Sequence, residues 1–300
     1  MKMNKPFIIF CFLILFFSFR SSSAQTESDA IAVRIIPNPN HFSVYYWYEK
    51  QGFNGAPQTL SVDGYEAIRD GRTVYVNAAN VKGKEIFTNI YLISYNQNPS
   101  AKTVDILGQI IKNWKFNTDL NESVNPAPSC VLSAFVCGKD SDCSSGQVCL
   151  SVDSSHDSSP TNKTCQLKEK RNCLTDTDCP ENFFCNSVKA KIIRDIKRIG
   201  QATEINEALA TYKSDNGYYP KLESGTYIPG QTISVWPSWN DVFLPALSLR
   251  RIVDPVNHLG DCPNFDPITC WNNNTKKFYN NSNGNLILPP KSFAIAYKTL

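Results

Sequence analysis

The cysteines between residues 130 and 185 restrict the fold of this 300-residue chain more than any other feature. They form two sets of four, and "CGKDSDC" in the first set aligns with "CLTDTDC" thirty-six residues later. Self-similarity of this kind indicates an internal duplication. Two such short units cannot bury much apolar core, so we expect disulfide bonds to hold them. The cysteines concerned are Cys130, Cys137, Cys143, Cys149, Cys165, Cys173, Cys179 and Cys185.

The spacing of these cysteines disfavours a zinc or redox site. Zinc-binding cysteines usually lie two to four residues apart, whereas each gap here is five residues or more. The redox pair C-x-x-C is also missing from the sequence. Structural disulfides are therefore the better interpretation, although four cysteines in one unit still allow three pairings.

The repeat also resembles short extracellular cysteine-rich modules with a "C…D-x-D-C…G-x-x-C" core. Gly146 in "CSSGQVC" matches the glycine of that core, whereas the second copy reads "CPENFFC" and lacks it. The paired acids could offer oxygen ligands to calcium, but acids in tight turns more often cap backbone N–H groups, which is the role we expect. These acids are Asp140, Asp142, Asp176 and Asp178.

The first 24 residues have the order of a secretory signal peptide. Lys2 and Lys5 precede an apolar run over residues 7–17, and small polar residues lead to Ala24. The apolar run is short for a membrane span, which needs about 20 residues. We expect cleavage after Ala24, no stable membrane span afterwards, and a periplasmic, cell-surface or secreted protein with ten remaining cysteines.

The charge balance disfavours nucleic acid as a partner. Loss of residues 1–24 removes three basic residues and no acidic ones, leaving 27 of each sign. Binding to phosphates requires a surplus of positive charge.

Residues 25–118 predict one small α+β domain. "AIAVRII" suits a strand that ends at "PNPN", Asp70-Gly71 predicts a hairpin turn, and a second hairpin is expected across "KGK" at 82–84. The sequence then changes to a helical period after Ser100, a plausible N-cap. We expect this helix to cover a sheet face with Val104, Leu107, Ile110, Ile111 and Trp114.

The remaining boundaries follow from shifts in composition. Residues 119–129 contain two prolines and few large apolar residues, which indicates a linker. The cysteine-rich region then occupies 130–186, and a third domain occupies 187–300.

A helix of roughly 25 residues is predicted at the start of the third domain. Five basic residues gather at its beginning, which is compatible with an anionic lipid, an acidic partner or a solvated face, the last being the commonest case. These are Lys189, Lys191, Arg194, Lys197 and Arg198. Its apolar stripe comprises Ile192, Ile196, Ile199, Ala202, Ile205, Leu209 and Tyr212.

The segment "RDIKRIGQATEINEALATYKSDNGYYP" resembles the second half of the long helix, with its closing turn, in type II secretion major pseudopilins. "LPALS" and "DPVN" are similar to a later loop of that family, and the resemblance covers about residues 189–300. It implies a globular head in which the helix packs on a small antiparallel sheet, with "KSFAIAYKTL" as its last strand.

The same resemblance implies a calcium-binding loop before the final strands. Asp254, Asp261 and Asp266 are the residues considered for it, while the pair Cys262 and Cys270 suggests that a disulfide holds this loop instead. Residues "CPENFFCNSVKA" replace the apolar half-helix that pseudopilins use to pack in a fibre. We therefore do not expect this chain to polymerise in that way.

Signatures of catalysis are few. His41, His156 and His258 lie in no H-E-x-x-H motif, and the chain has no G-x-S-x-G motif and no glycine-rich phosphate loop. His258 beside Asp254 and Asp261 is the best acid–base cluster, although such polar loops are usually only solvated.

The overall prediction is an α+β chain formed by a small α+β domain, a duplicated disulfide-rich unit and a pilin-like head. Its expected function is non-enzymatic display, adhesion or protein interaction at a bacterial cell envelope, in connection with a pilus or secretion system. One alternative is a glycan-binding protein that uses exposed Trp47, Trp236 and Trp239, and another is a cell-envelope hydrolase.

Overall fold

The computed structural model describes residues 29–117, 127–143, 145–151, 163–169, 171–180, 183–222, 226, 229–257, 271–272, 277–278 and 293–299. These residues form helices and antiparallel sheets, which confirms the α+β class. The predicted signal peptide and most of the predicted linker lie outside the described residues.

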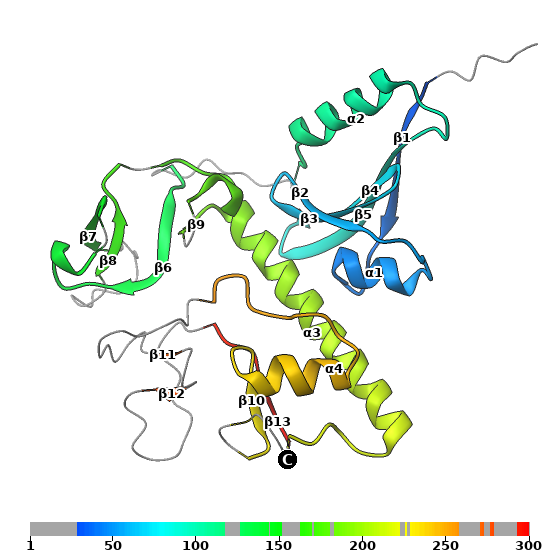
Figure 1. Ribbon diagram of the computed structural model, residues 1–300. Helices are drawn as coiled ribbons and strands as arrows, with labels where there is room; N and C mark the ends of the chain where they lie inside the picture. The colour runs from blue at the N-terminus through cyan, green and yellow to red at the C-terminus, as the bar shows by residue number, and fades with distance from the viewer. Residues whose placement is uncertain are drawn as a thin grey trace, which may run out of the picture.

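The N-terminal part is a five-stranded antiparallel sheet in the order β1-β5-β4-β3-β2 (Figure 1). Four strands follow one another as hairpins, and β1 pairs with the outer edge of β5 from Ile31↔Tyr95 to Pro37↔Asn89. The strands are β1 (Ile31–Pro37), β2 (Gln58–Val62), β3 (Tyr65–Asp70), β4 (Thr73–Lys82) and β5 (Glu85–Tyr95).

The hairpins agree with the sequence prediction except in the position of one turn. The β4–β5 turn lies at "KGK" as predicted, because Lys82 pairs with Glu85. Asp70, however, pairs with Thr73, so the β3–β4 turn is Gly71-Arg72 rather than Asp70-Gly71. The Asp-Gly turn instead joins β2 to β3, where Asp63 and Gly64 have φ angles of 52° and 82°.

The two faces of the sheet are covered by different helices. Helix α1 (Val44–Lys50) is capped by Ser43 and packs Trp47 and Tyr48 on one face, against Ile68 and Tyr75. The opposite face packs against helix α3 (Val188–Asn216), which comes from the C-terminal part of the chain. Alternating strand residues serve the two faces, as expected for a pleated sheet buried on both sides.

The helix predicted after Ser100 exists and packs against the sheet beside β5, with part of the predicted apolar face. Helix α2 (Ala101–Asn113) is capped by Ser100 as expected, and Leu107 is buried. Val104 is exposed, whereas Ile111 and Trp114, at the end of the helix, pack on the core shared with α3. Helix α3 packs on the same core through Ile192 and Ile196, so α2 and α3 share this face of the sheet.

The cysteine-rich region is a four-stranded sheet in the order β7-β8-β6-β9. Its strands are β6 (Cys130–Val136), β7 (Gln147–Ser151), β8 (Lys163–Leu167) and β9 (Phe183–Cys185), with one-turn helices η1 (Asp140–Asp142) and η2 (Asp176–Asp178). Four disulfides lie among the described residues, and they are typical of proteins that fold in an oxidising environment outside the cytoplasm.

The disulfides repeat one pattern, but with a different boundary between the units than the sequence suggested. In the first unit, Cys137 bonds Cys149 and Cys143 bonds Cys165. The strands β7 and β8 place Cys149 directly opposite Cys165. The unit therefore joins its first cysteine to its third and its second to its fourth.

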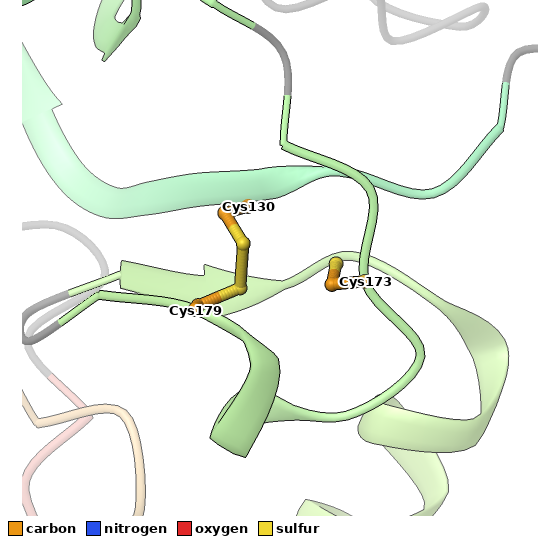
Figure 2. A group of neighbouring side chains, drawn as sticks. All are labelled: Cys130, Cys173 and Cys179. Atoms are coloured by element: carbon orange, nitrogen blue, oxygen red, sulfur yellow. A yellow bond between two sulfur atoms is a disulfide. The ribbon is translucent and has the colours of Figure 1, made fainter.

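The second unit takes its fourth cysteine from before the first unit. Cys173 bonds Cys185, and Cys179 bonds Cys130, the earliest cysteine of the region (Figure 2). Strands β9 and β6 place Cys185 opposite Cys130, the same register as in the first unit. The second unit is thus completed by β6, which comes before the first unit in the chain and takes the place of a strand after β9. We call this arrangement the circular closure of the duplication.

The repeated acids cap backbone groups, as expected. Asp140 accepts the N–H of Cys149 at 2.8 Å, and Asp176 accepts the N–H of Cys185 at 2.8 Å. Asp142 takes two N–H groups of the preceding turn, and these backbone hydrogen bonds lower its pKa.

Helix α3 contacts all three parts of the molecule and runs from the cysteine-rich region past the five-stranded sheet to the C-terminal part (Figure 1). It begins at the cap Ser187 and ends at Gly217, whose φ of 81° closes the predicted turn. Gly200 allows a close approach, because a Cβ there would lie 2.5 Å from the carbonyl oxygen of His41.

The buried face of α3 is not the single stripe predicted. Ile192 and Ile196 pack under the five-stranded sheet, whereas Ile205 and Leu209 pack on the C-terminal part. Ile199 and Ala202 are exposed between them. The apolar stripe divides because the five-stranded sheet and the C-terminal part contact different sides of the helix.

The C-terminal part packs a short antiparallel pair and a helical turn against the second half of α3. Trp239, Phe243 and Leu244 form its buried core, and Tyr297 stacks on Phe243. "LPALS", expected as a loop, begins in helix α4. The elements are β10 (Gln231–Ile233), the π-helical turn η3 (Ser238–Phe243), α4 (Leu244–Ala246), β11 (Trp271–Asn272), β12 (Lys277–Phe278) and β13 (Ala296–Lys298), the last pairing with β10 within "KSFAIAYKTL".

Candidate functional site

An open groove of about 890 Å³ lies where α3 ends, beside β13. We call it the lysine–tyrosine groove after the side chains of its lining that carry the argument. These are Lys213, Tyr218, Tyr219, Lys221, Tyr297 and Lys298.

Three local features build this groove. Gly217 adopts a left-handed conformation, donates its N–H to the carbonyl of Lys213 at 2.8 Å, and so turns the chain back across the helix end. The hydroxyl of Tyr297 donates to the carbonyl of Pro220 at 3.2 Å and ties the turn to β13. The register of β13 with β10 then places Lys298 beside Gln231.

Each of the two exposed tyrosines forms a cation–π contact with a lysine. Tyr218 and Tyr219 are 50% and 46% exposed, which is high for aromatic side chains in a folded protein. The Nζ atom of Lys213 lies 4.7 Å from the ring centre of Tyr219, and that of Lys221 lies 5.3 Å from that of Tyr218. Aromatic faces and positive charges are therefore offered together.

The lining of the groove is positive. Lys213, Lys221 and Lys298 are exposed, and no acidic side chain stands among the described residues that line the groove. Burial raises the pKa of Tyr297, so its phenol stays neutral near pH 7. The site is chemically suited to an anion with a flat apolar face, and nothing in it resembles a nucleophile with a base.

Asp254, considered as a calcium ligand, is paired with an arginine. Its two carboxylate oxygens accept from Nε and Nη2 of Arg198 at 2.7 and 3.1 Å, and one also accepts the N–H of Val256. This pairing raises the pKa of Arg198. Asp261, Asp266, Cys262 and Cys270 lie outside the described residues, so the calcium loop and its disulfide stay predictions.

One of the three histidines, His41, lies among the described residues. The Nδ1 atom of His41 lies 3.1 Å from the hydroxyl oxygen of Thr88. His156 and His258 lie outside the described residues.

The three tryptophans proposed as sugar-binding platforms are buried. Trp47, Trp236 and Trp239 are 6%, 2% and 0% exposed, and the Nε1 of Trp239 donates to the carbonyl of Ile252 at 2.9 Å. They serve cores rather than a binding face. The sequence signal for the groove is the pair Tyr218 and Tyr219 between Lys213 and Lys221, which the sequence predictions did not include as a binding site.

Three of the five basic residues at the beginning of α3 form ion pairs within the molecule. Lys189 pairs with Asp63, Arg194 with Asp176 at 2.6 Å, and Arg198 with Asp254, whereas Lys191 and Lys197 are exposed. The cluster is therefore neither a free cationic patch nor a simple solvated face.

Among the helices of the described residues, none has the length and apolar character needed to cross a membrane. Comparison of the chain with protein-family models, with curated proteins and with solved structures found no match in any of the three. The likenesses to pseudopilins and to cysteine-rich modules therefore stay predictions.

Proposed function

We propose that this protein is an exported, non-enzymatic binding protein of a bacterial cell envelope, and that its lysine–tyrosine groove holds acidic polysaccharide. The observation that carries the proposal is the pairing of exposed Tyr218 and Tyr219 with Lys213 and Lys221 in an open groove. The leader-like first 24 residues and the four disulfides support a place outside the cytoplasm, at the surface or in the periplasm.

The chemistry of an acidic sugar chain fits each part of the groove. Pyranose rings present apolar C–H faces that pack on tyrosine rings, and their carboxylates or phosphates pair with lysine ammonium groups. An open groove suits a polymer that continues beyond the site on both sides. A binding role of this kind is consistent with adhesion or display, and it replaces the buried tryptophans as the basis for glycan recognition.

The proposal is tested by titrating the purified full chain with acidic and neutral polysaccharides, for example polygalacturonate and dextran, at two salt concentrations. We expect binding to polygalacturonate that weakens with added salt, because exposed charges are screened. Tyr218→Ala and Tyr219→Ala should each weaken binding about three- to tenfold, the effect of roughly 0.5–1.5 kcal/mol for an aromatic contact.

Matched variants separate the groove from general charge. Lys213→Gln and Lys221→Gln should weaken binding, whereas Lys191→Gln, an exposed lysine at the other end of α3, should leave it unchanged. Equal binding of dextran and polygalacturonate, or equal effects of all three lysine variants, would contradict the proposal.

A further inference from the structure

A second, smaller cavity lies between α1, β3, the middle of α3 and the segment 248–253. Its volume is about 250 Å³, below the range of about 300–1,000 Å³ usual for drug-sized ligands, so it suits a small molecule. The lining residues that matter here are Ser43, Glu66, Lys197, Gln201, Glu204 and Arg251.

Two hydrogen-bond acceptors of α3 are buried at this cavity. Glu204 is 6% exposed and accepts the N–H of Ser43 at 2.7 Å, yet it forms no ion pair with any cation among the described residues. Gln201, also 6% exposed, donates through Nε2 to the carbonyl of Val253 at 3.0 Å. Its Oε1 is buried and accepts no hydrogen bond from the part of the chain that the structure describes.

Burial of these two acceptors without a full set of partners destabilises the folded chain. A buried acceptor without a donor, and a buried carboxylate without a counter-charge, both lower the stability of the folded state. Burial accordingly raises the pKa of Glu204, against the hydrogen bond from Ser43. Residues three apart on a helix share a face, so Gln201 and Glu204 present their oxygens to one region.

The same cavity carries cations at its exposed side. Lys197 and Arg251 line it, are exposed, and form no ion pair within the described residues. Arg250, by contrast with these two cations, is paired. Its Nη2 lies 2.9 Å from Oε1 of Glu49, and its Cζ lies 3.5 Å from the ring centre of Tyr45. The cavity thus combines buried acceptors with positive charge near solvent, and its lining also holds the carboxylate of Glu66, whose charge adds to the rise in the pKa of Glu204.

We propose that this cavity binds a free α-amino acid. The ammonium group of the ligand donates to Glu204 and Gln201, and its carboxylate pairs with Lys197 and Arg251. One zwitterion supplies both missing partners, which neither a simple amine nor a simple acid does. The site is separate from the lysine–tyrosine groove and does not depend on the function proposed for it.

The test is calorimetric titration and thermal denaturation of the purified full chain with each of the twenty amino acids. We expect at least one to bind with a 1:1 stoichiometry and to raise the unfolding temperature with its concentration. Its N-acetyl and carboxamide derivatives should bind at least about tenfold more weakly, because each removes one charged partner. The absence of saturable binding by any amino acid at millimolar concentration overturns the proposal.

Variants locate the site and guard against misfolding. Glu204→Gln keeps the acceptor for Ser43 and should weaken binding about tenfold, and the exposed Arg251→Ala should weaken it about three- to tenfold. Asp215→Asn, which changes an exposed acid of the same helix outside the cavity, should have no effect. Unchanged affinity in both Glu204→Gln and Arg251→Ala overturns the assignment of the cavity, whatever the groove variants show.

Discussion

At the scale of single residues, Asp63 is the most heavily engaged acid of the N-terminal sheet. It sits in the β2–β3 turn, its side chain is 1% exposed, and it accepts from Lys189, Lys115 and the N–H of Phe116. Lys189 is itself buried and belongs to α3, 126 residues away. One turn residue therefore joins the first sheet to the start of the long helix.

We expect Asp63→Asn to lower the free energy of unfolding by about 3–5 kcal/mol, because it leaves the buried ammonium of Lys189 without its counter-charge. Chemical denaturation measures this. The control is Asp195→Asn, which removes an exposed pair with Arg198 and should cost only about 0.3–0.5 kcal/mol. Similar losses of stability in the two variants would show that the buried pair with Lys189 stabilises the fold no more than the exposed pair does.

Glu204 gives a prediction about pH. Its pKa is raised above the ordinary value of 4.5 by burial, so the folded chain holds this proton more tightly than the unfolded chain does. The stability linked to the protonated carboxyl is fully present below pH 4.5 and is lost as the pH rises through the folded pKa.

Glu204→Gln stays neutral at every pH and keeps the acceptor for Ser43. We expect the variant to unfold at a higher temperature than the parent at pH 7, and the difference to shrink as the pH falls below the ordinary glutamate value. Thermal scans from pH 3 to pH 8 measure this. A pH-independent difference would mean that packing, not ionisation, separates the two proteins.

At the scale of elements, the two cysteine units serve as controls for each other. Asp140 and Asp176 make the same capping contact, but Asp176 also pairs with Arg194 of α3, whose guanidinium is buried and donates to the carbonyl of Cys185. At these two acids, the units therefore differ by the contact with Arg194.

We expect Asp176→Asn to cost about 1.5–3 kcal/mol more than Asp140→Asn, the range for a hydrogen bond to a charged group. Denaturant titration of both variants with intact disulfides gives the comparison. If the two variants lose equal stability, the contact between the second unit and α3 contributes nothing beyond the cap.

The elements also show what sequence reasoning could reach. The cap Ser100, the "KGK" hairpin and the end of α3 in the "NGYYP" turn were predicted because their signals are local, whereas the cap Ser187 was not predicted. The Asp-Gly signal at residues 63–64 was present but not used. The pairing of cysteines across units was not predicted, although Cys137 and Cys173 are each followed by two further cysteines at the same spacing, which marks the true start of each unit.

At the scale of the whole molecule, α3 connects parts that are distant in sequence. Lys189 contacts the first sheet, Arg194 the cysteine-rich region and Arg198 the C-terminal part. Partners of this kind are set by tertiary packing and leave no local pattern, so the cluster of basic residues alone could not reveal them. The two candidate sites share this origin, since each is assembled around α3 from segments far apart in the chain.

The circular closure of the duplicated region has a consequence for how the chain matures. A ribosome delivers residues from the N-terminus, so Cys130 is made first, and its partner Cys179 follows 49 residues later. An oxidant acting on cysteines in order of their appearance would join Cys130 to Cys137, which is a wrong bond. Correct maturation therefore requires either a delay in oxidation until Cys179 has emerged or an enzyme that reshuffles early errors. The cell that makes this protein therefore has to keep Cys130 reduced until Cys179 is available, or else correct the early bond by disulfide isomerisation.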